Sequence, residues 1–192
     1  MGHGDGARIR VFGGNAVIIA LTGTPGTGKT AAAECLRDAG EYVIDLNKHI
    51  EDNGLKERFD KKRDTYNVDI ERLNASIRPL TREKKNVFLE GHLSHFLDCD
   101  MIIVIRCNPS VLYERLKARN YAPSKILENV QAEALDVILC ESSDPDAQVF
   151  ETDTTSRTPE QTASAIMEIV KGNTDGYGKG SVNWSEEMEK WC

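Results

Sequence analysis

The feature that most constrains this chain is the stretch "LTGTPGTGKTA" at residues 21–31. Gly23, Gly28, Lys29 and Thr30 match the pattern G-x-x-x-x-G-K-[ST], directly after an apolar run and at the start of a helix-like segment. Backbone N–H groups at the start of such a helix favour phosphate oxygens, the lysine neutralises the β and γ phosphates, and the threonine hydroxyl can ligate Mg²⁺. We therefore expect a nucleotide to bind here through its phosphates, although kinases, hydrolases and molecular switches all share such a loop.

Five short apolar runs follow one another along the chain, with helix-like segments between them. The runs are "AVIIAL" (16–21), "YVIDL" (42–46), "NVFLE" (86–90), "MIIVIR" (101–106) and a weaker "QVFET" (148–152). The helix-like segments cover residues 29–40, 69–80, 109–120, 123–142 and 158–172. Continuous apolar runs of this length are typical of buried parallel strands. The alternation predicts an α/β fold of three layers around a parallel sheet, with ligands at the carboxyl ends of the strands.

Length and composition indicate one folded domain. The chain has 192 residues, of which 40% are hydrophobic and 29% are charged, as in soluble globular proteins. Residues 1–15 are rich in glycine and lack periodicity, so we expect a flexible extension there. The glycine-rich stretch "GNTDGYGKG" ends the alternating pattern, and residues 172–192 are expected to form an acidic C-terminal tail. The folded domain is thus expected to span residues 16–171.

Charge and cysteine usage exclude several classes of protein. The formal net charge of -7 argues against strong binding to nucleic acid, which needs clustered lysine and arginine, and a basic protein partner suits it better. The five cysteines are scattered and show no CxxC spacing, so neither a disulfide framework nor a zinc site is expected. The apolar runs are too short to span a membrane, and "AVIIAL" is too short for a signal peptide. We expect a cytoplasmic protein without membrane contact.

Two acidic residues end predicted strands and are candidates for a metal shell. Glu90 ends "NVFLE" and Asp45 ends "YVID". P-loop proteins keep a carboxylate at such a strand end, where it helps to hold Mg²⁺ through water. An acid at a strand end is also often a turn or helix-cap residue. The pattern alone leaves the choice between Glu90 and Asp45 open.

His92 and His95 follow in "EGHLSH". The spacing H-x-x-H suggests a metal, but zinc sites need further Cys or His ligands, and the sequence around this pair does not supply a second pair at zinc-site spacing. A surface or hydrogen-bonding histidine is therefore the simpler interpretation. If the phosphates lie close by, His92 could orient a water molecule or an acceptor group.

Two arginines in "YERLKARNY", Arg115 and Arg119, are four residues apart and so share one face of a helix. Phosphoryl transfer needs cations over the migrating charge, and the planar guanidinium supplies them. Two arginines at this spacing are equally typical of a solvated helix face.

The polar stretch at residues 47–69 is long for a crossover loop. Loops of this length are usually functional or disordered.

Together, "LTGTPGTGKT", "VIDLN", "EGHLSH", "VLYERLKARNY" and "KILENVQAEALDVILCES" resemble the isoenzyme-six adenylate kinases, the coilin-interacting nuclear ATPase family, and most closely its archaeal members. The resemblance covers residues 16–171 and reaches the "VNWSEE" sequence of the tail. It implies the fold of a P-loop nucleoside monophosphate kinase with a five-stranded sheet. It also implies a small monophosphate-binding insert at about residues 47–70 and a short lid at about residues 117–127.

The resemblance also assigns roles to individual residues. It implies that ATP is bound by Gly26, Thr27, Gly28, Lys29, Thr30, Ala31 and Arg119. Lys29, His92 and Arg119 would act in catalysis, the last of these from the lid. Thr30 and Glu90 would hold Mg²⁺, although the eukaryotic members have Asp where this chain has Glu90.

Two functions from different classes follow from this resemblance. As an enzyme, the protein would transfer the γ-phosphate of ATP to a nucleoside monophosphate, foremost AMP. As an assembly factor, it would hydrolyse ATP while remodelling a partner during maturation of the small ribosomal subunit, the partner being a basic ribosomal protein of the uS-eleven type. A kinase for another small acceptor is a third possibility, because shikimate-type kinases share the loop and the topology. The sequence leaves the three open.

Overall fold

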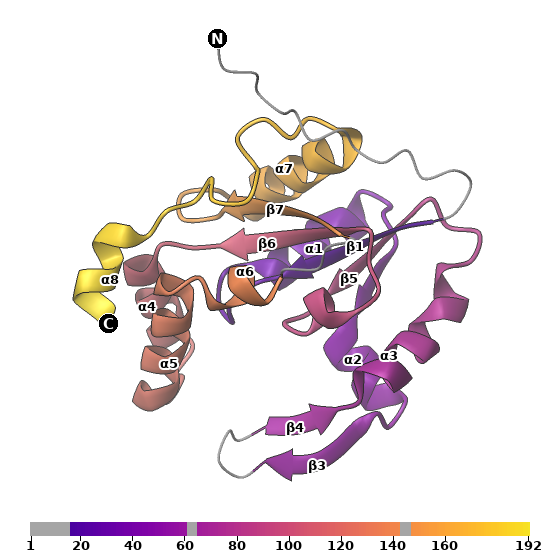
Figure 1. Cartoon of the computed structure of the whole chain (residues 1–192), viewed down its shortest axis with the longest axis horizontal. Helices are drawn as coiled ribbons and strands as arrows, with labels where there is room; N and C mark the ends of the chain where they lie inside the picture. Colours follow the sequence, from indigo (N-terminus) through magenta and orange to yellow (C-terminus); the bar gives the residue numbers. More distant parts are fainter. Residues whose placement is uncertain (1–15, 61–64, 143–146) are drawn as a thin grey trace.

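The computed structural model describes residues 16–60, 65–142 and 147–192, so the extension expected at residues 1–15 lies outside the described part of the chain. Five strands form one sheet in the order β2-β5-β1-β6-β7, and every neighbouring pair is parallel (Figure 1). The strands are β1 (Val17–Thr22), β2 (Val43–Asp45), β5 (Asn86–Glu90), β6 (Met101–Arg106) and β7 (Gln148–Asp153). Each strand coincides with one of the five apolar runs. The predicted α/β fold with a five-stranded parallel sheet is confirmed.

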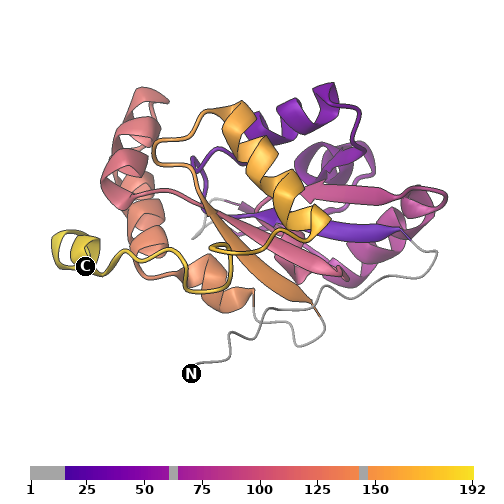
Figure 2. The same ribbon diagram turned by 90° about the horizontal axis from the view of Figure 1, so that it is seen from above.

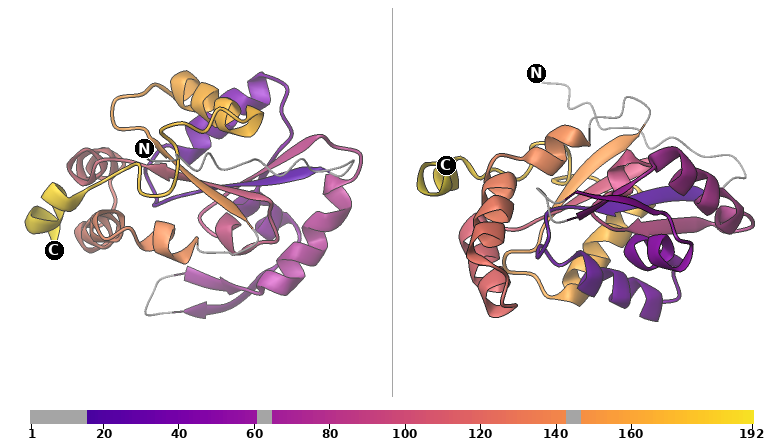
Figure 3. Two further views of the ribbon diagram at one scale, coloured as in Figure 1. Left: turned by 45° about the horizontal axis from the view of Figure 1, so that its top comes forward. Right: turned by 90° about the horizontal axis from the view of Figure 1, so that it is seen from below.

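Helices cover both faces of the sheet. The helices α1 (Lys29–Asp38) and α7 (Pro159–Lys171) lie next to each other on one face (Figure 2). The opposite face is covered by α2 (Leu46–Asp52), α3 (Ile70–Ile77) and α6 (Val137–Glu141), so the three layers are visible edge-on (Figure 3). Because both faces are covered, the strands bury most of their side chains, which explains why they read as continuous apolar runs.

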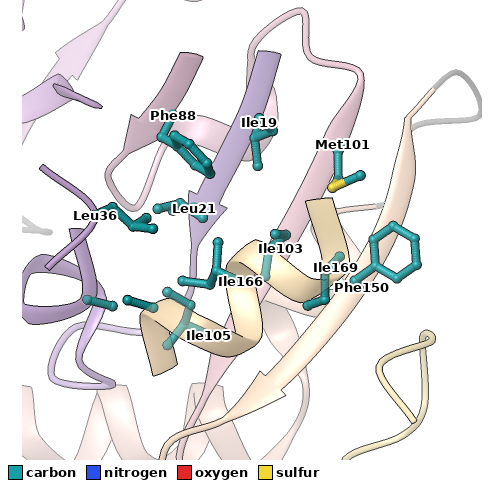
Figure 4. Close-up of a cluster of buried hydrophobic side chains, with 12 residues drawn as sticks. Ile19, Leu21, Leu36, Phe88, Met101, Ile103, Ile105, Phe150, Ile166 and Ile169 are labelled. Carbon is teal, nitrogen blue, oxygen red and sulfur yellow. The ribbon is translucent and has the colours of Figure 1, made fainter. Parts of the chain in front are cut away.

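Alternate strand residues form two separate cores. On the face of α1 and α7, strand side chains such as Ile19, Leu21 and Ile103 pack around Leu36 and Ile166 (Figure 4). The neighbouring strand residues point to the other face and pack against α2, α3 and α6. They include Ala20, Val87, Leu89, Ile102 and Val104.

The segment between β2 and α3 contains structure that the sequence did not reveal. The strands β3 (Lys56–Asp60) and β4 (Thr65–Val68) pair antiparallel, so part of the polar stretch at residues 47–69 is a hairpin. Its sequence is charged and lacks the regular alternation of a half-buried strand, because most of its described side chains are exposed.

Beyond the carboxyl end of β6, α4 (Pro109–Ala118) and α5 (Pro123–Ala134) pack on each other. The sequence predicts one helix over residues 123–142, but the structure breaks it at Asp136, which has a left-handed φ of 55°. The break carries the Asp136 carboxylate to the buried guanidinium of Arg106. A tertiary ion pair therefore overrides the helical pattern at this point.

The C-terminal segment packs against the rest of the fold. It ends in α8 (Ser185–Trp191), which contacts α4 and α5, and the ring of Trp191 lies 5.1 Å from the ring of Tyr113. Within the described residues, no helix is both long enough and apolar enough to cross a membrane.

Candidate active site

The loop between β1 and α1 is built on glycines with left-handed backbone conformations. Gly26 has a φ of 94° and Gly28 a φ of 104°. A Cβ atom on Gly26 would lie 2.8 Å from Leu116 and 2.9 Å from Leu112, both on α4, so glycine is needed for space as well as for conformation. Gly28 precedes α1, whose first turn has no acidic residue, and no described side chain caps it. The first N–H groups of α1 are therefore available to an anion.

Lys29 is buried at the start of α1. Its Nζ donates to the carbonyl oxygens of Gly23 at 2.6 Å and Thr24 at 2.9 Å. Burial lowers the pKa of Lys29 to about 8, although the charges of Glu90 and Glu133 act in the opposite direction. Among the described residues, no carboxylate forms an ion pair with Lys29. A buried cation without a counter-ion is suited to binding phosphate.

Thr30 and Glu90 come together between α1 and the end of β5. The Thr30 hydroxyl donates to Glu90 Oε1 at 3.1 Å, and Glu90 is only 3% exposed. Burial raises the pKa of Glu90, and the hydrogen bond from Thr30 opposes that effect. Asp45 is opposite Glu90 in the sheet register, but its carboxylate accepts the N–H of Lys48 at 3.0 Å and caps α2. Of the two candidate acids, Glu90 is thus the one that meets the loop.

The Thr30 and Glu90 oxygens fit Mg²⁺ by their chemistry. Mg²⁺ takes oxygen ligands and is usually held by one or two carboxylates together with substrate phosphates and water. In the described part of the chain, no three His, Cys, Asp or Glu side chains form a group that could hold a metal without such a substrate. The two oxygens would therefore hold Mg²⁺ as a partner of a bound nucleotide.

His92 lies in the turn after β5 and is exposed. Partial burial of its ring lowers its pKa, and the positive charges of Lys29 and Lys125 lower it further. The ring is therefore within electrostatic range of the Lys29 ammonium. It is expected to be neutral near pH 7, when it can accept a proton or a hydrogen bond.

His95 occupies a different environment, in the short 3-10 helix η2 (Ser94–Phe96). It is buried, and its Nδ1 lies 2.8 Å from the hydroxyl of Thr22. Burial lowers the pKa of His95 to about 4, so its 3.5 Å contact with Glu141 is not an ion pair near pH 7. The interpretation of a hydrogen-bonding histidine holds for His95, whereas His92 is the histidine beside the loop.

A cavity of about 350 Å³ lies beside the loop. It is lined by the loop, the end of α4 and the connection from β7 to α7, through Gly26, Gly28, Ala31, Arg115, Ala118, Arg119, Thr154, Arg157, Pro159 and Thr162. The volume falls within the range of small-molecule pockets, about 300 to 1,000 Å³. Its position next to the helix start suits a ligand that carries phosphates.

Arg115 and Arg119 both line the cavity, but they differ in their contacts. Arg115 donates to the carbonyl oxygen of Thr154 at 2.8 Å and to the Thr154 hydroxyl at 3.1 Å, which ties α4 to the connection after β7. Arg119 follows the last residue of α4 and is exposed, and its guanidinium has no hydrogen-bond or ion-pair partner among the described residues. The positive charge of Arg119 lowers the pKa of Lys29, although this effect is smaller than those of burial, Glu90 and Glu133. The two cations therefore share one site. Arg119 is therefore the arginine that can reach a ligand.

Sequence reasoning missed Thr154 and Glu133. The Thr154 hydroxyl donates to the carbonyl oxygen of Thr27 at 2.6 Å and so links the loop to the end of β7. Its position just beyond a predicted strand was a usable signal, because ligands gather at the carboxyl ends of parallel strands. Glu133 lies inside a predicted helix and gave no such signal, yet its carboxylate accepts the hydroxyl of Thr24 at 2.6 Å.

The chain is similar to a set of archaeal proteins over most of its length. A family described as the AAA domain matches residues 19–136. A protein of Methanocaldococcus jannaschii named "Putative adenylate kinase" is 44% identical over 88% of this chain and 93% of its own. A protein of the same name from Archaeoglobus fulgidus is 42% identical over 90% of this chain and 94% of its own.

A solved structure with a similar fold is a shikimate kinase from Acinetobacter baumannii in complex with shikimate. It superimposes with a TM-score of 0.57, at 17% sequence identity, over 82% of this chain and 94% of its own. At this identity the likeness is one of fold alone.

Proposed function

The chain belongs to the family of archaeal proteins named "Putative adenylate kinase", and we propose that it transfers the γ-phosphate of ATP to AMP. The observation that carries the proposal is the convergence of Lys29, Thr30 and Glu90 beside a cavity that Arg119 lines. A cation, a hydroxyl and an acid at the start of one helix are the groups that phosphoryl transfer requires.

Each group has a distinct part in this proposal. The N–H groups after Gly28 and the ammonium of Lys29 hold the β and γ phosphates, while adenine and ribose occupy the cavity next to Ala31. Bound Mg²⁺, held by Thr30 and Glu90, would supply charge neutralisation at the phosphate oxygens. Arg119, in a lid at residues 117–127, places its guanidinium over the migrating phosphoryl group.

The acceptor would bind in the insert at residues 47–70, which comprises most of α2 and the β3–β4 hairpin. This segment follows the carboxyl end of β2, next to the end of β5 where Glu90 lies. An acceptor held there would approach the γ-phosphate from the side opposite the ATP cavity, as in-line transfer requires.

The test is a coupled assay of ATP turnover with AMP, CMP, UMP, dAMP and shikimate, one acceptor at a time. We expect AMP to give the highest kcat/KM, with two ADP molecules formed for each ATP consumed. Lys29→Met is the matched control for contaminating kinase. Turnover that none of the five acceptors increases would contradict the kinase proposal, and a preference for shikimate would replace AMP as the acceptor.

A second candidate is ATP hydrolysis, favoured by the position of His92, whose ring lies within range of the Lys29 charge. A neutral imidazole there could orient a water molecule towards the γ-phosphate. His92→Ala is expected to lower phosphate release about ten-fold or more while the Kd for ATP stays nearly unchanged. Unchanged phosphate release together with a lower Tm would assign His92 to a structural hydrogen bond.

The hydrolysis candidate includes a role in maturation of the small ribosomal subunit with a basic partner of the uS-eleven type. The net charge of -7 favours such a partner, because complementary charges raise the association rate at low salt. The proposal also includes a cytoplasmic location, which five cysteines without CxxC spacing favour. Titration of a purified uS-eleven-type protein at low and moderate salt, with ADP, an ATP analogue or neither, tests the interaction. The absence of binding at low salt in all three states would contradict it.

A further inference from the structure

A cluster of buried charges lies next to the phosphate-binding loop and has no part in the reaction proposed above. Arg106, the last residue of β6, is 1% exposed and contacts the carboxylates of Glu133, Asp136 and Glu151. Burial alone would lower the pKa of Arg106, but the charges and hydrogen bonds of Glu133 and Asp136 raise it instead. Buried ionic groups are costly to desolvate, so a network of this size calls for a specific role.

Glu133 is the member of this cluster that reaches the loop. Its Oε2 accepts the hydroxyl of Thr24 at 2.6 Å, and its Oε1 accepts Arg106 Nε at 2.7 Å. The same Oε1 also accepts the N–H of Cys107 and the indole N–H of Trp184, each at 3.2 Å. Glu133 is 2% exposed, so its carboxylate depends on these donors in place of water. One side chain of α5 thereby joins the loop, the end of β6 and the C-terminal segment.

Thr24 connects this carboxylate to the phosphate-binding lysine. The carbonyl oxygen of Thr24 accepts Lys29 Nζ at 2.9 Å, as well as the Thr27 N–H at 3.2 Å and the Thr27 hydroxyl at 2.9 Å. A hydrogen bond that fixes the Thr24 side chain therefore also fixes the carbonyl that orients Lys29 and Thr27. The charge of Glu133 acts on Lys29 directly as well, since it raises the lysine pKa against the larger effect of burial.

Contacts of the C-terminal segment hold Trp184, whose indole N–H donates to Glu133, in place. Glu187 of α8 accepts the Ser110 hydroxyl at 2.6 Å and the Asn108 amide at 3.1 Å, both at the start of α4. The Gly180 N–H donates to Glu151 Oε1 at 2.5 Å. Residues 173–192 therefore enter the charged cluster at two points, through Gly180 and Trp184.

We propose that Glu133 is a positioning residue for the phosphate-binding loop and that Trp184 of the C-terminal segment orients it. The proposal rests on the proposed nucleotide-phosphate function of the loop. It requires that loss of the hydrogen bond from Thr24 to Glu133, or of the one from Trp184 to Glu133, weakens ATP binding. Neither Glu133 nor Trp184 lines the nucleotide cavity.

Thr24→Val tests the loop side of this contact. Valine keeps the shape of threonine and removes the donor to Glu133, so we expect the KM for ATP and the Kd for MgADP to rise about ten-fold, with a smaller change in kcat. Thr24→Ser restores the donor and should recover most of the lost affinity. A rise in KM of less than two-fold in Thr24→Val would contradict the positioning role.

Trp184→Phe tests the C-terminal side and has a matched control in the same segment. It removes the N–H donor to Glu133, and we expect a several-fold rise in the Kd for MgADP. Trp191→Phe removes a similar donor, which binds Ser110 and Glu187, and leaves Glu133 untouched. A purely structural segment would give both variants a lower Tm and equal nucleotide affinity. That result would contradict the proposal.

The same two variants give a spectroscopic test, because the chain has two tryptophans. In Trp191→Phe the remaining fluorescence comes from Trp184, and we expect MgADP to change it with a midpoint at the Kd. In Trp184→Phe the signal of Trp191 should not respond. If the wild-type protein binds MgADP but the Trp184 signal stays flat, the positioning proposal is wrong while the kinase proposal stands. If the wild-type protein binds neither MgADP nor MgATP, the proposed function itself is wrong.

Discussion

Lys29 has surroundings that are unusual for a lysine. Its ammonium is buried, bound by two carbonyl oxygens and surrounded at longer range by Glu90, Glu133 and Arg119. The pKa of a lysine ammonium shifts readily on burial. Lys29 therefore supplies a positive charge at neutral pH but has an unusually low pKa.

Lys29→Met is expected to abolish kinase and ATPase activity together, by about a hundred-fold or more, because both reactions need the same phosphate charge neutralised. The fold should survive, since methionine fills most of the volume of the lysine stem. The measurement is steady-state turnover with circular dichroism as the check of folding. A folded variant with near-normal turnover would show that the loop is not the phosphate site.

The low pKa of Lys29 also predicts a pH dependence of nucleotide affinity. The cationic form binds phosphate, and it is lost as the pH rises through the pKa of about 8. We therefore expect the Kd for ADP to increase above pH 8 in the wild-type protein and to stay flat in Lys29→Met. Equal slopes in the two proteins between pH 7 and pH 9 would rule out Lys29 as the titrating group.

Arg119 and Arg115 allow a contrast between two arginines four residues apart. Arg119→Ala is expected to lower kcat and kcat/KM by about a hundred-fold, because its charge would act mainly in the transition state. Arg119→Lys should recover little, since an ammonium cannot reproduce the planar fork. Arg115→Ala should lower the Tm instead, because Arg115 ties α4 to Thr154. Full activity of Arg119→Ala would leave Arg119 as a solvated surface residue.

At the scale of elements, the loop and α4 are fitted to each other at Gly26. The nearest side chains to a Cβ at this position belong to Leu112 and Leu116, which also form the core between α4 and α5. The loop therefore cannot be changed without displacing the helix that carries Arg119. This packing is the physical link between the loop and Arg119, which follows α4.

Gly26→Ala is expected to cost about 3 kcal/mol of folding free energy, from left-handed strain and from overpacking against α4. Gly40→Ala is the matched control, because Gly40 also has a positive φ but no neighbouring atom within 4 Å of its added Cβ. The control should lose only about 1 kcal/mol. Urea unfolding of both variants measures the difference, and equal losses would show that α4 adapts freely.

At the scale of the whole molecule, His95 makes the stability of the fold depend on pH. Its ring is buried between Thr22 and Glu141, and burial lowers its pKa to about 4, with a further effect from His92. The unfolded chain, with a histidine pKa of about 6.5, binds more protons than the folded protein between these two values. Acid therefore favours unfolding in this window.

We expect the free energy of unfolding to fall by at most about 3 kcal/mol as the pH drops from 6.5 to 4, from His95 alone. His95→Gln keeps a polar group near Thr22 and cannot titrate, so its stability should depend less on pH in this window. His49→Gln, in α2, where the ring is half-buried beside Ser76, controls for the loss of a histidine. Parallel pH profiles for wild type and His95→Gln would show that His95 does not carry the effect.

The sheet, the loop and most helices could be predicted from the sequence, because they follow from local patterns. Apolar runs predict buried strands, and the spacing of Gly28, Lys29 and Thr30 predicts the phosphate cradle. The end of α7 at Gly172, with its left-handed φ of 105°, follows equally from local chemistry. In each case the physical cause lies within a few residues of its effect.

Candidates that share a local pattern could be told apart only from their contacts in the folded chain. Glu90 and Asp45 both end strands, but only Glu90 meets Thr30, because α1 starts beside β5 and Asp45 is engaged at the start of α2. The contact between Thr24 and Glu133 joins residues 109 positions apart. No local pattern encodes such a pair, because its energy depends on burial and on packing of the whole chain.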